Sequence, residues 1–396
     1  MLWGQANAEP VTLVRALAEQ RHHFARTRVF LGVGLSGAMQ PGHADAIDFL
    51  GYCGSGFNRQ LAEAGLLDIW PGHYSDLPAR IRSGALRIDV LMLQVPPADA
   101  SGRHSLGLAH DYLLAALATA RVVIAEVNEQ APWTMGLQHL DAARIDASVK
   151  ASYAPLCSRS PASGPVERAI AAHAASLIED RATLQCGLGA LPEAVLAALH
   201  GRRDLGVHSG AVGDGVMALM EAGVISNAYK GRDPGASVAG VLMGSSRLHR
   251  YAHRNPALQM RGTEYTHDPD VLASLPRFVA INSAIEVDLS GQVNAEVAAG
   301  CYVGAVGGAV DFVRGAQRSR GGVPIIALPA TAGAHSRIVA KLSGPVSTPR
   351  CDAGVFVTEY GIADLRGLPL AARRRRMLDI AHPEHRARLE RETSGR

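Results

Sequence analysis

Short apolar segments alternate with segments of helical spacing along most of this chain, and this alternation restricts the fold more than any other feature. Ile88–Val95 and Arg121–Val127 are apolar runs suited to buried strands, and His110–Ala120 between them has helical spacing. A strand, a helix and a second strand in that order form a unit whose two strands are parallel. Arg28–Gly34 adds an earlier strand that ends at a glycine turn. The first part of the chain is therefore predicted to contain a mostly parallel sheet.

The same alternation begins again after a stretch that is rich in proline and serine. Lys150–Pro165 contains three prolines and four serines, a composition typical of a linker. The chain is thereby divided into residues 1–149, a linker at 150–165, and residues 166–396, and we expect two similar α/β domains with mostly parallel sheets. Ligands of such folds bind at the carboxyl ends of the strands. Further helices are predicted at Val166–Leu177, Pro192–His200 and Leu370–Arg391, and further strands at Ala182–Cys186, Leu205–His208, Val323–Leu328 and Gly354–Val357.

Composition excludes several classes of protein. A chain of 396 residues can bury large cores in two domains. A formal charge of +3 is nearly neutral for this length and argues against nucleic acid as a partner. The five cysteines are scattered and odd in number, which fits free thiols in the cytoplasm. No signal peptide and no run of 18 apolar residues occurs, so we expect neither secretion nor membrane insertion. The sixteen histidines follow no metal-binding spacing, and no metal is expected.

A glutamate followed by a glycine-rich segment is the strongest candidate for a reactive centre. Phe278–Leu289 alternates strictly and is predicted to be one strand, with Asn282, Glu286 and Asp288 on its polar face. Ser290-Gly291 is predicted to be a tight turn. The segment 304–312 that follows contains Gly307-Gly308, where a backbone without side chains lets a ligand approach closely. Covalent acyl transfer through a glutamate needs a carboxylate on a rigid strand beside such a loop. The alternative is that Glu286 is a solvated charge.

Two other motifs are weaker. Gly187-x-Gly189-x-x-Pro192 follows a predicted strand and opens a helix, but a proline stands where a dinucleotide fingerprint has its third glycine. The start of that helix remains a possible anion site. His208 ends a predicted strand, where ligands of α/β folds bind, so it is a candidate to contact substrate or shape the site; the alternative is a histidine that only packs in the core. Neither a phosphate-binding P-loop motif nor the G-x-S-x-G motif of serine hydrolases occurs.

Taken together, these segments resemble the acetyl-CoA hydrolase/transferase family, which includes 4-hydroxybutyrate CoA-transferases. Asn282–Leu289 is similar to the stretch that, in this family, carries the glutamate that becomes acylated. Val306–Phe312 is similar to the loop that follows that stretch. The resemblance covers nearly the whole chain. The other matching stretches are Ile88–Pro97, Val123–Asn128, Gly187–Pro192, Val207–Gly210 with Asp214-Gly215, Val357–Gly367 and Ile380–Pro383.

The resemblance implies an acyl-CoA:carboxylate CoA-transferase, of the acetyl-CoA or 4-hydroxybutyrate type, that works through a glutamyl-CoA thioester on Glu286. The alternative is an acyl-CoA hydrolase that uses the same glutamate, and a non-catalytic binding protein is a third class. The family's active site lies between its two domains. Coenzyme A thioesters and small carboxylic acids would be substrates, with no bound cofactor, and we expect a cytoplasmic homodimer or higher homo-oligomer. The CoA- or substrate-binding residues implied are Asn282, Gly307, Gly308, Gly361, Gly367 and His208.

The chain also departs from the family pattern at two places. Longer members carry an additional helix and strand before the segment that resembles Gly4–Pro10, so the edge of the first domain is expected to differ. Ala309 stands after the double glycine, where the family usually has a polar residue. The binding of the acceptor acid is expected to be altered there.

Overall fold

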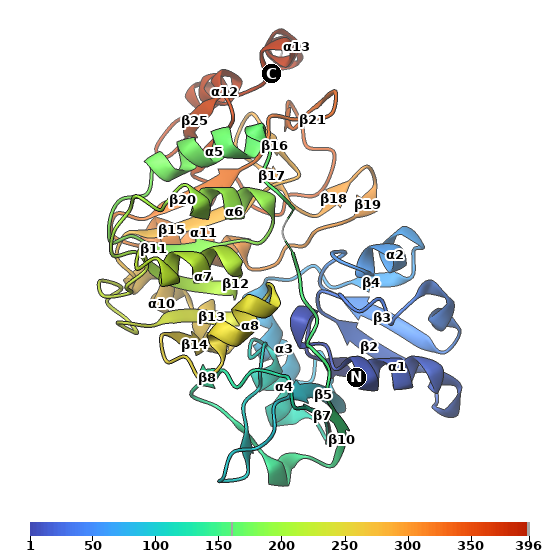
Figure 1. Ribbon diagram of the computed structural model, residues 1–396. Coiled ribbons are helices and arrows are strands. Elements are labelled where there is room, and N and C mark those ends of the chain that lie inside the picture. Colours follow the sequence, from blue (N-terminus) through green and yellow to red (C-terminus); the bar gives the residue numbers. More distant parts are fainter. Residues whose placement is uncertain (160, 394–396) are drawn as a thin grey trace.

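A computed structural model describes residues 1–159 and 161–393 of the chain; Ser160 of the predicted linker and residues 394–396 lie outside the described residues. The described residues form two large sheets, each with helices packed beside it (Figure 1). We refer to residues 1–151 as the first unit and to residues 165–393 as the second unit.

The first unit contains a seven-stranded sheet in which neighbouring strands run parallel. Two neighbouring strands, β5 and β7, are the two apolar runs of the predicted strand–helix–strand unit, and Leu91 lies opposite Val123. The expected parallel pairing is therefore confirmed. In spatial order the strands are β10 (Ala147–Ala151), β7 (Val122–Asn128), β5 (Val90–Val95), β1 (Leu2–Trp3), β2 (Thr27–Leu31), β3 (Ile47–Gly51) and β4 (Leu67–Ile69).

The second unit is built around a nine-stranded sheet that is parallel except at one edge, where β25 pairs antiparallel with β24. Its other edge strand, β8, comes from the first unit and pairs parallel with β14. The predicted domain division at residue 149 stays a prediction, since Met135–Gly136 belongs to this second sheet. In spatial order the strands are β25 (Gly361–Asp364), β24 (Val355–Thr358), β20 (Val323–Ala327), β15 (Phe278–Ser283), β11 (Thr183–Cys186), β12 (Gly206–Val212), β13 (Ser237–Leu242), β14 (Leu258–Met260) and β8 (Met135–Gly136).

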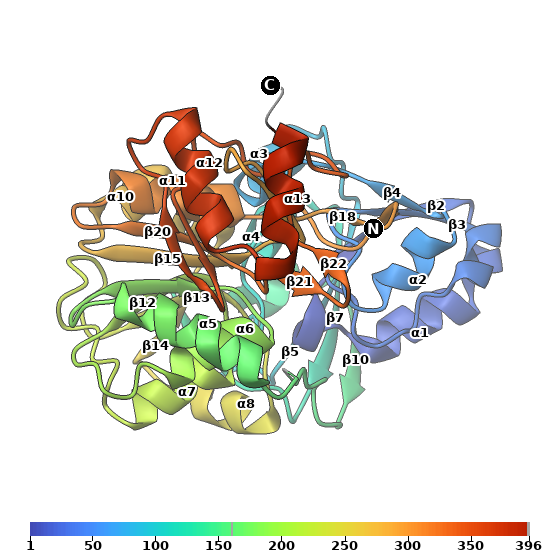
Figure 2. The ribbon, with the colours of Figure 1, turned by 90° about the horizontal axis from the view of Figure 1, so that it is seen from above.

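Helices cover both faces of the second sheet. Figure 2 shows α5 to α8 on one side of its strands and α10 to α12 on the other. No helix within the described part of the chain is long and apolar enough to cross a membrane. The helices are α1 (Val11–Glu19), α2 (Asn58–Glu63), α3 (Leu77–Arg82), α4 (Leu113–Thr119), α5 (Pro165–Ser176), α6 (Ala190–Ala197), α7 (Asp214–Glu221), α8 (Ser246–Ala252), α9 (Thr263–Thr266), α10 (Pro269–Ser274), α11 (Ala309–Arg318), α12 (Leu370–Asp379) and α13 (Pro383–Thr393).

One cluster of buried apolar side chains extends through both units. It includes Leu2 and Leu91 from the first sheet and Ile281 and Val355 from the second, each almost fully buried. Burial of apolar area is the main favourable contribution to folding, and here it also fixes the two units against each other. The ends of the strands of the second sheet are thereby placed beside loops of the first unit.

Two predicted elements are interrupted in the structure. The predicted strand Phe278–Leu289 is wrong as a single element: β15 ends at Ser283, and Glu286–Asp288 form a separate strand, β16. β16 pairs with β17 (Val293–Asn294) and β23 (Ile338–Val339) in a three-stranded sheet of their own. The predicted helix Leu370–Arg391 is divided into α12 and α13, because Pro383 disfavours a helical conformation in the residue before it.

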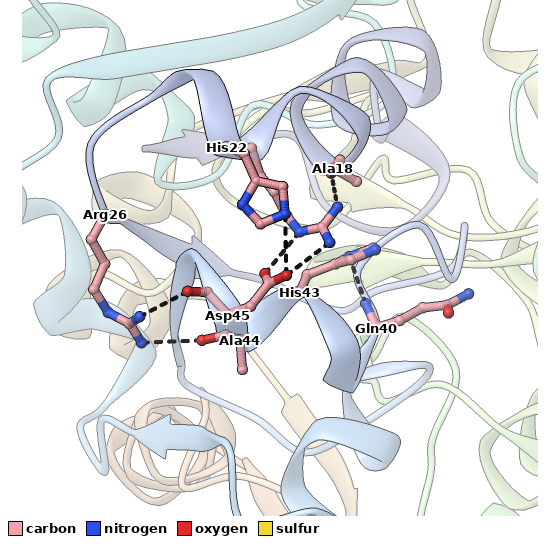
Figure 3. A network of polar contacts seen from close by, with 8 residues as sticks. Ala18, His22, Arg26, Gln40, His43, Ala44 and Asp45 are labelled. Atoms are coloured by element: carbon pink, nitrogen blue, oxygen red, sulfur yellow. Dashed lines mark hydrogen bonds and ion pairs between the residues drawn. The ribbon is translucent and has the colours of Figure 1, made fainter.

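An exposed ionic cluster is centred on Asp45, just before β3 of the first unit (Figure 3). Both carboxylate oxygens of Asp45 accept hydrogen bonds from Arg21, at 2.8 and 2.9 Å, and His22 lies 3.3 Å from one of them. Arg26 donates to the main-chain oxygens of Ala44 and Asp45. The bond from Arg21 lowers the pKa of Asp45 to about 2. Exposed ion pairs of this kind contribute little to stability, and none of the predicted site residues belongs to this cluster.

Candidate active site

A cavity of about 230 Å³ lies where strands of the second sheet end against the first unit. Cys186, at the end of β11, and Asn282, near the end of β15, contribute to its floor. Carboxyl ends of parallel strands are the usual ligand sites of α/β folds, so this cavity is the candidate active site. The first unit contributes Gln5, Val33, Tyr52 and Tyr74; the remaining lining residues are 185–188, Gly210, Ala211, Val241, Met243, His267, Asn282, 307–309 and Phe312.

The glycine-rich segment before α11 is held by two loops of the first unit. The N–H of Gly54 donates to the Gly304 oxygen at 3.1 Å, and the N–H of Tyr74 donates to the Gly307 oxygen at 3.0 Å. The Ser75 hydroxyl donates to Asp311 in the first turn of α11 at 2.8 Å. Gly307 has a φ of +58°, in the left-handed region that glycine adopts without strain. The loop is therefore shaped by both units.

Three of the predicted binding residues meet at this cavity: Asn282, Gly307 and Gly308. The Asn282 side-chain amide donates to Gln185 Oε1 at 3.1 Å, and the Gln185 amide returns a longer contact of 3.5 Å. This reciprocal amide pair fixes two polar side chains on the cavity floor. Asn282 is 8% exposed, which places its amide at the boundary between the core and the cavity.

Glu286 lies outside this set of residues. Four hydrogen bonds reach its Oε1 atom: from the Ser343 N–H at 2.6 Å, the Ser343 hydroxyl at 2.8 Å, the Gly344 N–H at 3.1 Å and the Asn294 amide at 3.1 Å. The side chain is mostly buried, and it does not line the cavity. The sequence prediction assumed a continuous strand from Asn282 to Glu286. Because β15 ends at Ser283, the carboxylate instead belongs to the separate sheet of β16.

The other three predicted binding residues also lie away from the cavity wall. His208, on β12, is fully buried, and its Nε2 lies 3.2 Å from the main-chain oxygen of Thr266. It supports the segment that carries His267 and does not reach the cavity itself. Gly361 begins β25 with a φ of +141°, and Gly367 has a φ of +71° in the turn after that strand. A role for these two glycines in CoA binding stays a prediction.

His267 is a cavity residue that the sequence analysis missed. Its ring lies between Tyr74 and Phe312, with centroid distances of 5.0 and 4.5 Å. Its Nε2 faces two glycines: a Cβ atom added at Gly308 would lie 2.4 Å from Nε2, and one added at Gly210 would lie 3.1 Å from it. Burial lowers the pKa of His267 to about 3. The only local signal was a helix start, Asp268-Pro269, and that pattern does not place the histidine before it at a ligand site.

The described residues that line the cavity include no Asp, Glu, Lys or Arg. A carboxyl group does lie directly behind the wall. Asp111 is fully buried and accepts hydrogen bonds from the Gln5 amide at 2.7 Å and from the Tyr74 hydroxyl at 3.2 Å. Burial raises the pKa of Asp111 to about 6. The surface offered to a ligand is thus uncharged, aromatic and amide-bearing, with a titratable acid behind it.

Comparisons with known proteins agree with this architecture. Residues 1–147 match the model described as the acetyl-CoA hydrolase/transferase N-terminal domain, and residues 244–393 match that of the C-terminal domain. A 4-hydroxybutyrate coenzyme A transferase from Clostridium kluyveri is 38% identical over 98% of this chain and 92% of its own length. RipA from Yersinia pestis superposes with a TM-score of 0.95 at 32% identity, covering 100% of this chain and 93% of RipA. A 4-hydroxybutyrate CoA-transferase from Porphyromonas gingivalis has a TM-score of 0.84 at 33% identity, covering 100% and 92%.

Proposed function

The chain belongs to the acetyl-CoA hydrolase/transferase family, and from this premise we propose that it moves CoA from an acyl-CoA to a free carboxylic acid. Its relatives are named CoA-transferases, and this chain is accordingly an enzyme that transfers CoA. The observation that supports a site for this reaction is the cavity between the units, where the glycine-rich loop and the strand ends meet. A short acyl group bound as a thioester would fit its uncharged wall of Tyr52, Tyr74 and Met243.

The start of α11 would stabilise the charge that develops on the thioester carbonyl. Gly308 precedes the first turn of this helix, and both Gly308 and Ala309 line the cavity. The first N–H groups of a helix have no partner within the helix, and the helix dipole favours negative charge near them. An oxyanion placed there accepts hydrogen bonds from groups that are already oriented, which is the largest single contribution in many acyl transfers.

Glu286 is our proposed nucleophile. Its Oε2 would attack the donor thioester, releasing CoA thiolate and leaving an acyl-glutamyl anhydride. The thiolate then attacks the glutamyl carbonyl, which frees the donor acid and leaves a glutamyl-CoA thioester. An acceptor carboxylate repeats both steps in reverse, so the thioester bond is conserved and no ATP is consumed. Four donors on Oε1 support this role, because they fix the carboxylate with Oε2 as the oxygen left for attack. The thioester would have to extend from the cavity to β16.

We propose further that the protein works in the cytoplasm as a homo-oligomer and that it carries no bound cofactor. All five cysteines are free thiols, which fits a reducing compartment. Light scattering at several protein concentrations measures the oligomeric state directly.

The test of the transfer reaction is a panel of short acyl-CoAs, each incubated with the protein and then with borohydride. Borohydride reduces a glutamyl thioester to a primary alcohol, which peptide mass spectrometry locates. Modification of the peptide that contains Glu286, dependent on acyl-CoA and reversed by an acceptor acid, supports the proposal. CoA exchange between acids without modification of that peptide rules out Glu286 as the nucleophile while keeping the transferase activity. Absence of exchange with every donor and acceptor pair rejects the proposed function.

A further inference from the structure

We propose that the cavity binds the free carboxylic acid of the transfer reaction together with one proton, and that Asp111, behind the cavity wall, holds this proton. The inference rests on the proposed function, because it takes a free acid as the ligand of the cavity. Burying an anion is costly unless it is hydrogen-bonded and its charge is offset, and a proton taken up nearby does both. Asp111 is thus a positioning residue that acts on the ligand through Tyr74.

The Gln5 side chain has a single orientation that satisfies its neighbours. Its Oε1 accepts a hydrogen bond from the main-chain N–H of Val33 at 3.1 Å, and a main-chain N–H can only donate. The Tyr52 hydroxyl donates to the same oxygen at 2.8 Å. Gln5 Nε2 therefore faces Asp111, and it donates to Asp111 Oδ2 and to the Tyr74 hydroxyl oxygen, each at 2.7 Å. Both amide hydrogens are used, so Gln5 has none left for a ligand.

Tyr74 links Asp111 to the cavity that it lines. While Asp111 is ionised it can only accept, so the Tyr74 hydroxyl donates its one hydrogen to Oδ2, at 3.2 Å. A proton on Oδ2 reverses this bond: Asp111 then donates to the Tyr74 oxygen, and the Tyr74 hydrogen is free to turn to a ligand. The bonds from Gln5 persist in both states, and so does the bond from the Leu113 N–H to Asp111 Oδ1, at 3.1 Å. Uptake of one proton therefore gives the wall one donor for an anion.

No cation offsets the charge of Asp111 within the described part of the chain. The arginines beside α9, which begins next to Asp111, are paired elsewhere: Arg261 lies 3.7 Å from Asp233, and Arg82 is bound to Glu264. Burial raises the pKa of Asp111 to about 6, and a second negative charge in the cavity raises it further. Burial also lowers the pKa of two neighbouring histidines to about 3, so both are neutral at pH 7. The other titratable side chains on the elements around Asp111 are Tyr52, Cys53, Asp76, Tyr112 and Tyr265, with His110 and His267 as the two histidines.

A second buried acid is the alternative holder of the proton. Asp311, in the first turn of α11, accepts a hydrogen bond from the Ser75 hydroxyl at 2.8 Å, and burial raises its pKa to about 6 as well. Tyr74 and Ser75 are consecutive, so one loop contacts both acids. Among the described residues, however, no side chain of the cavity wall donates to Asp311, whereas Gln5 and Tyr74 both donate to Asp111. The geometry therefore favours Asp111.

Calorimetric titration of the full chain with butyrate, in the absence of acyl-CoA, measures the proton directly. Titrations in two buffers of different ionisation enthalpy give the number of protons taken up for each butyrate bound. We expect roughly half a proton or more at pH 7, and an affinity that falls about tenfold from pH 6 to pH 8, since the proton becomes harder to acquire as the pH rises. Butyramide has the same shape and no charge, so it is the matched ligand and is expected to bind without proton uptake.

Two matched carboxyl variants identify the group that takes up the proton. Asp111→Asn is neutral at every pH and is expected to abolish both the proton uptake and the pH dependence of butyrate affinity. Asp311→Asn is expected to keep both. If Asp111→Asn fails to fold, which its melting temperature reveals, Tyr74→Phe tests the same connection. Without the hydroxyl hydrogen, butyrate affinity is expected to fall more at pH 6 than at pH 8.

Butyrate that binds to the wild type without proton uptake overturns the proposal, and so does an absence of butyrate binding. Uptake that persists in Asp111→Asn, or that disappears only in Asp311→Asn, overturns it as well. The proposed function is tested separately, because CoA exchange is assayed with acyl-CoA present. Protein that binds butyrate with a proton but exchanges no CoA rejects the proposed function and leaves the proton-linked binding standing. Protein that exchanges CoA but binds butyrate without a proton does the opposite.

Discussion

The main-chain N–H of Tyr74 donates a hydrogen bond of 3.0 Å to the carbonyl oxygen of Gly307. This single bond joins a loop of the first unit to the glycine-rich loop of the second, more than two hundred positions later in the chain. Both residues line the cavity, so the contact that fixes the loop also shapes the candidate active site. Neither unit has this wall by itself.

Substitution of Gly54, in the other first-unit loop that contacts the glycine-rich segment, tests this interface. A Cβ atom added at Gly54 would lie 2.0 Å from the main-chain oxygen of Tyr302, so Gly54→Ala has to displace the segment that leads to Gly307. We expect a loss of about 1–3 kcal/mol in the free energy of unfolding, as for other overpacked sites. Activity is expected to fall with it. Gly42→Ala is the matched control, since no atom lies within 4 Å of a Cβ at that position. Equal urea midpoints for the two variants would contradict the expectation.

The Glu286→Gln variant distinguishes two roles for Glu286: a nucleophile, or only a hydrogen-bond acceptor that holds the segment at Ser343. The glutamine oxygen still accepts from Ser343 and Gly344, so the fold is expected to persist, whereas a neutral amide cannot form the anhydride. As a nucleophile variant it is expected to lose CoA exchange by several orders of magnitude, roughly the scale seen for covalent catalytic residues. Exchange assays and the borohydride-labelled peptide measure this. Exchange at the wild-type rate would leave Glu286 as the group that positions the segment at Ser343.

Asp111 is expected to make stability depend on pH. Burial raises its pKa in the folded protein to about 6, above the value of a carboxyl in an unfolded chain. The folded state therefore holds this proton more tightly, and its contribution to stability is greatest at low pH and is lost as the pH rises from about 4 to about 6. The difference amounts to about 3 kcal/mol at most. Urea unfolding of wild type and Asp111→Asn across this range checks it: the variant is expected to lack this part of the slope. Identical slopes in the two proteins would exclude Asp111 as the source.

Cysteine reactivity is expected to follow exposure and thiol pKa. Cys157 and Cys351 are exposed, whereas Cys53 and Cys186 are buried, and burial raises the pKa of these two thiols to about 11 and about 12. The thiolate is the reactive form, so iodoacetamide at pH 8 is expected to label the exposed pair first. Peptide mapping over time gives the order. Rapid labelling of Cys186 in the native protein would show that the cavity is more open and more polar than the structure has it.

Much of the secondary structure was predictable because local patterns determine it. Ile88–Val95 and Arg121–Val127 are long enough and apolar enough to be buried strands, and they appear as the parallel pair β5 and β7. The proline-led helix α5 begins at Pro165, one residue before the predicted start. The segment Phe278–Leu289 was mispredicted because alternation continues through Ala284, where the chain leaves the large sheet. A period of two in the sequence predicts that a segment is extended and which of its faces is apolar. It does not predict which sheet the segment joins.

The sequence by itself determined the class of fold and, through long matching segments, the family. The resemblance predicted a binding role for Asn282, Gly307 and Gly308; that role stays a prediction, and the three residues lie at one cavity. Only the tertiary structure decided that Glu286 and His208 lie off the cavity wall and that His267 lies on it. The physical reason is that a cavity between two units is formed by contacts distant in sequence, such as Tyr74 with Gly307.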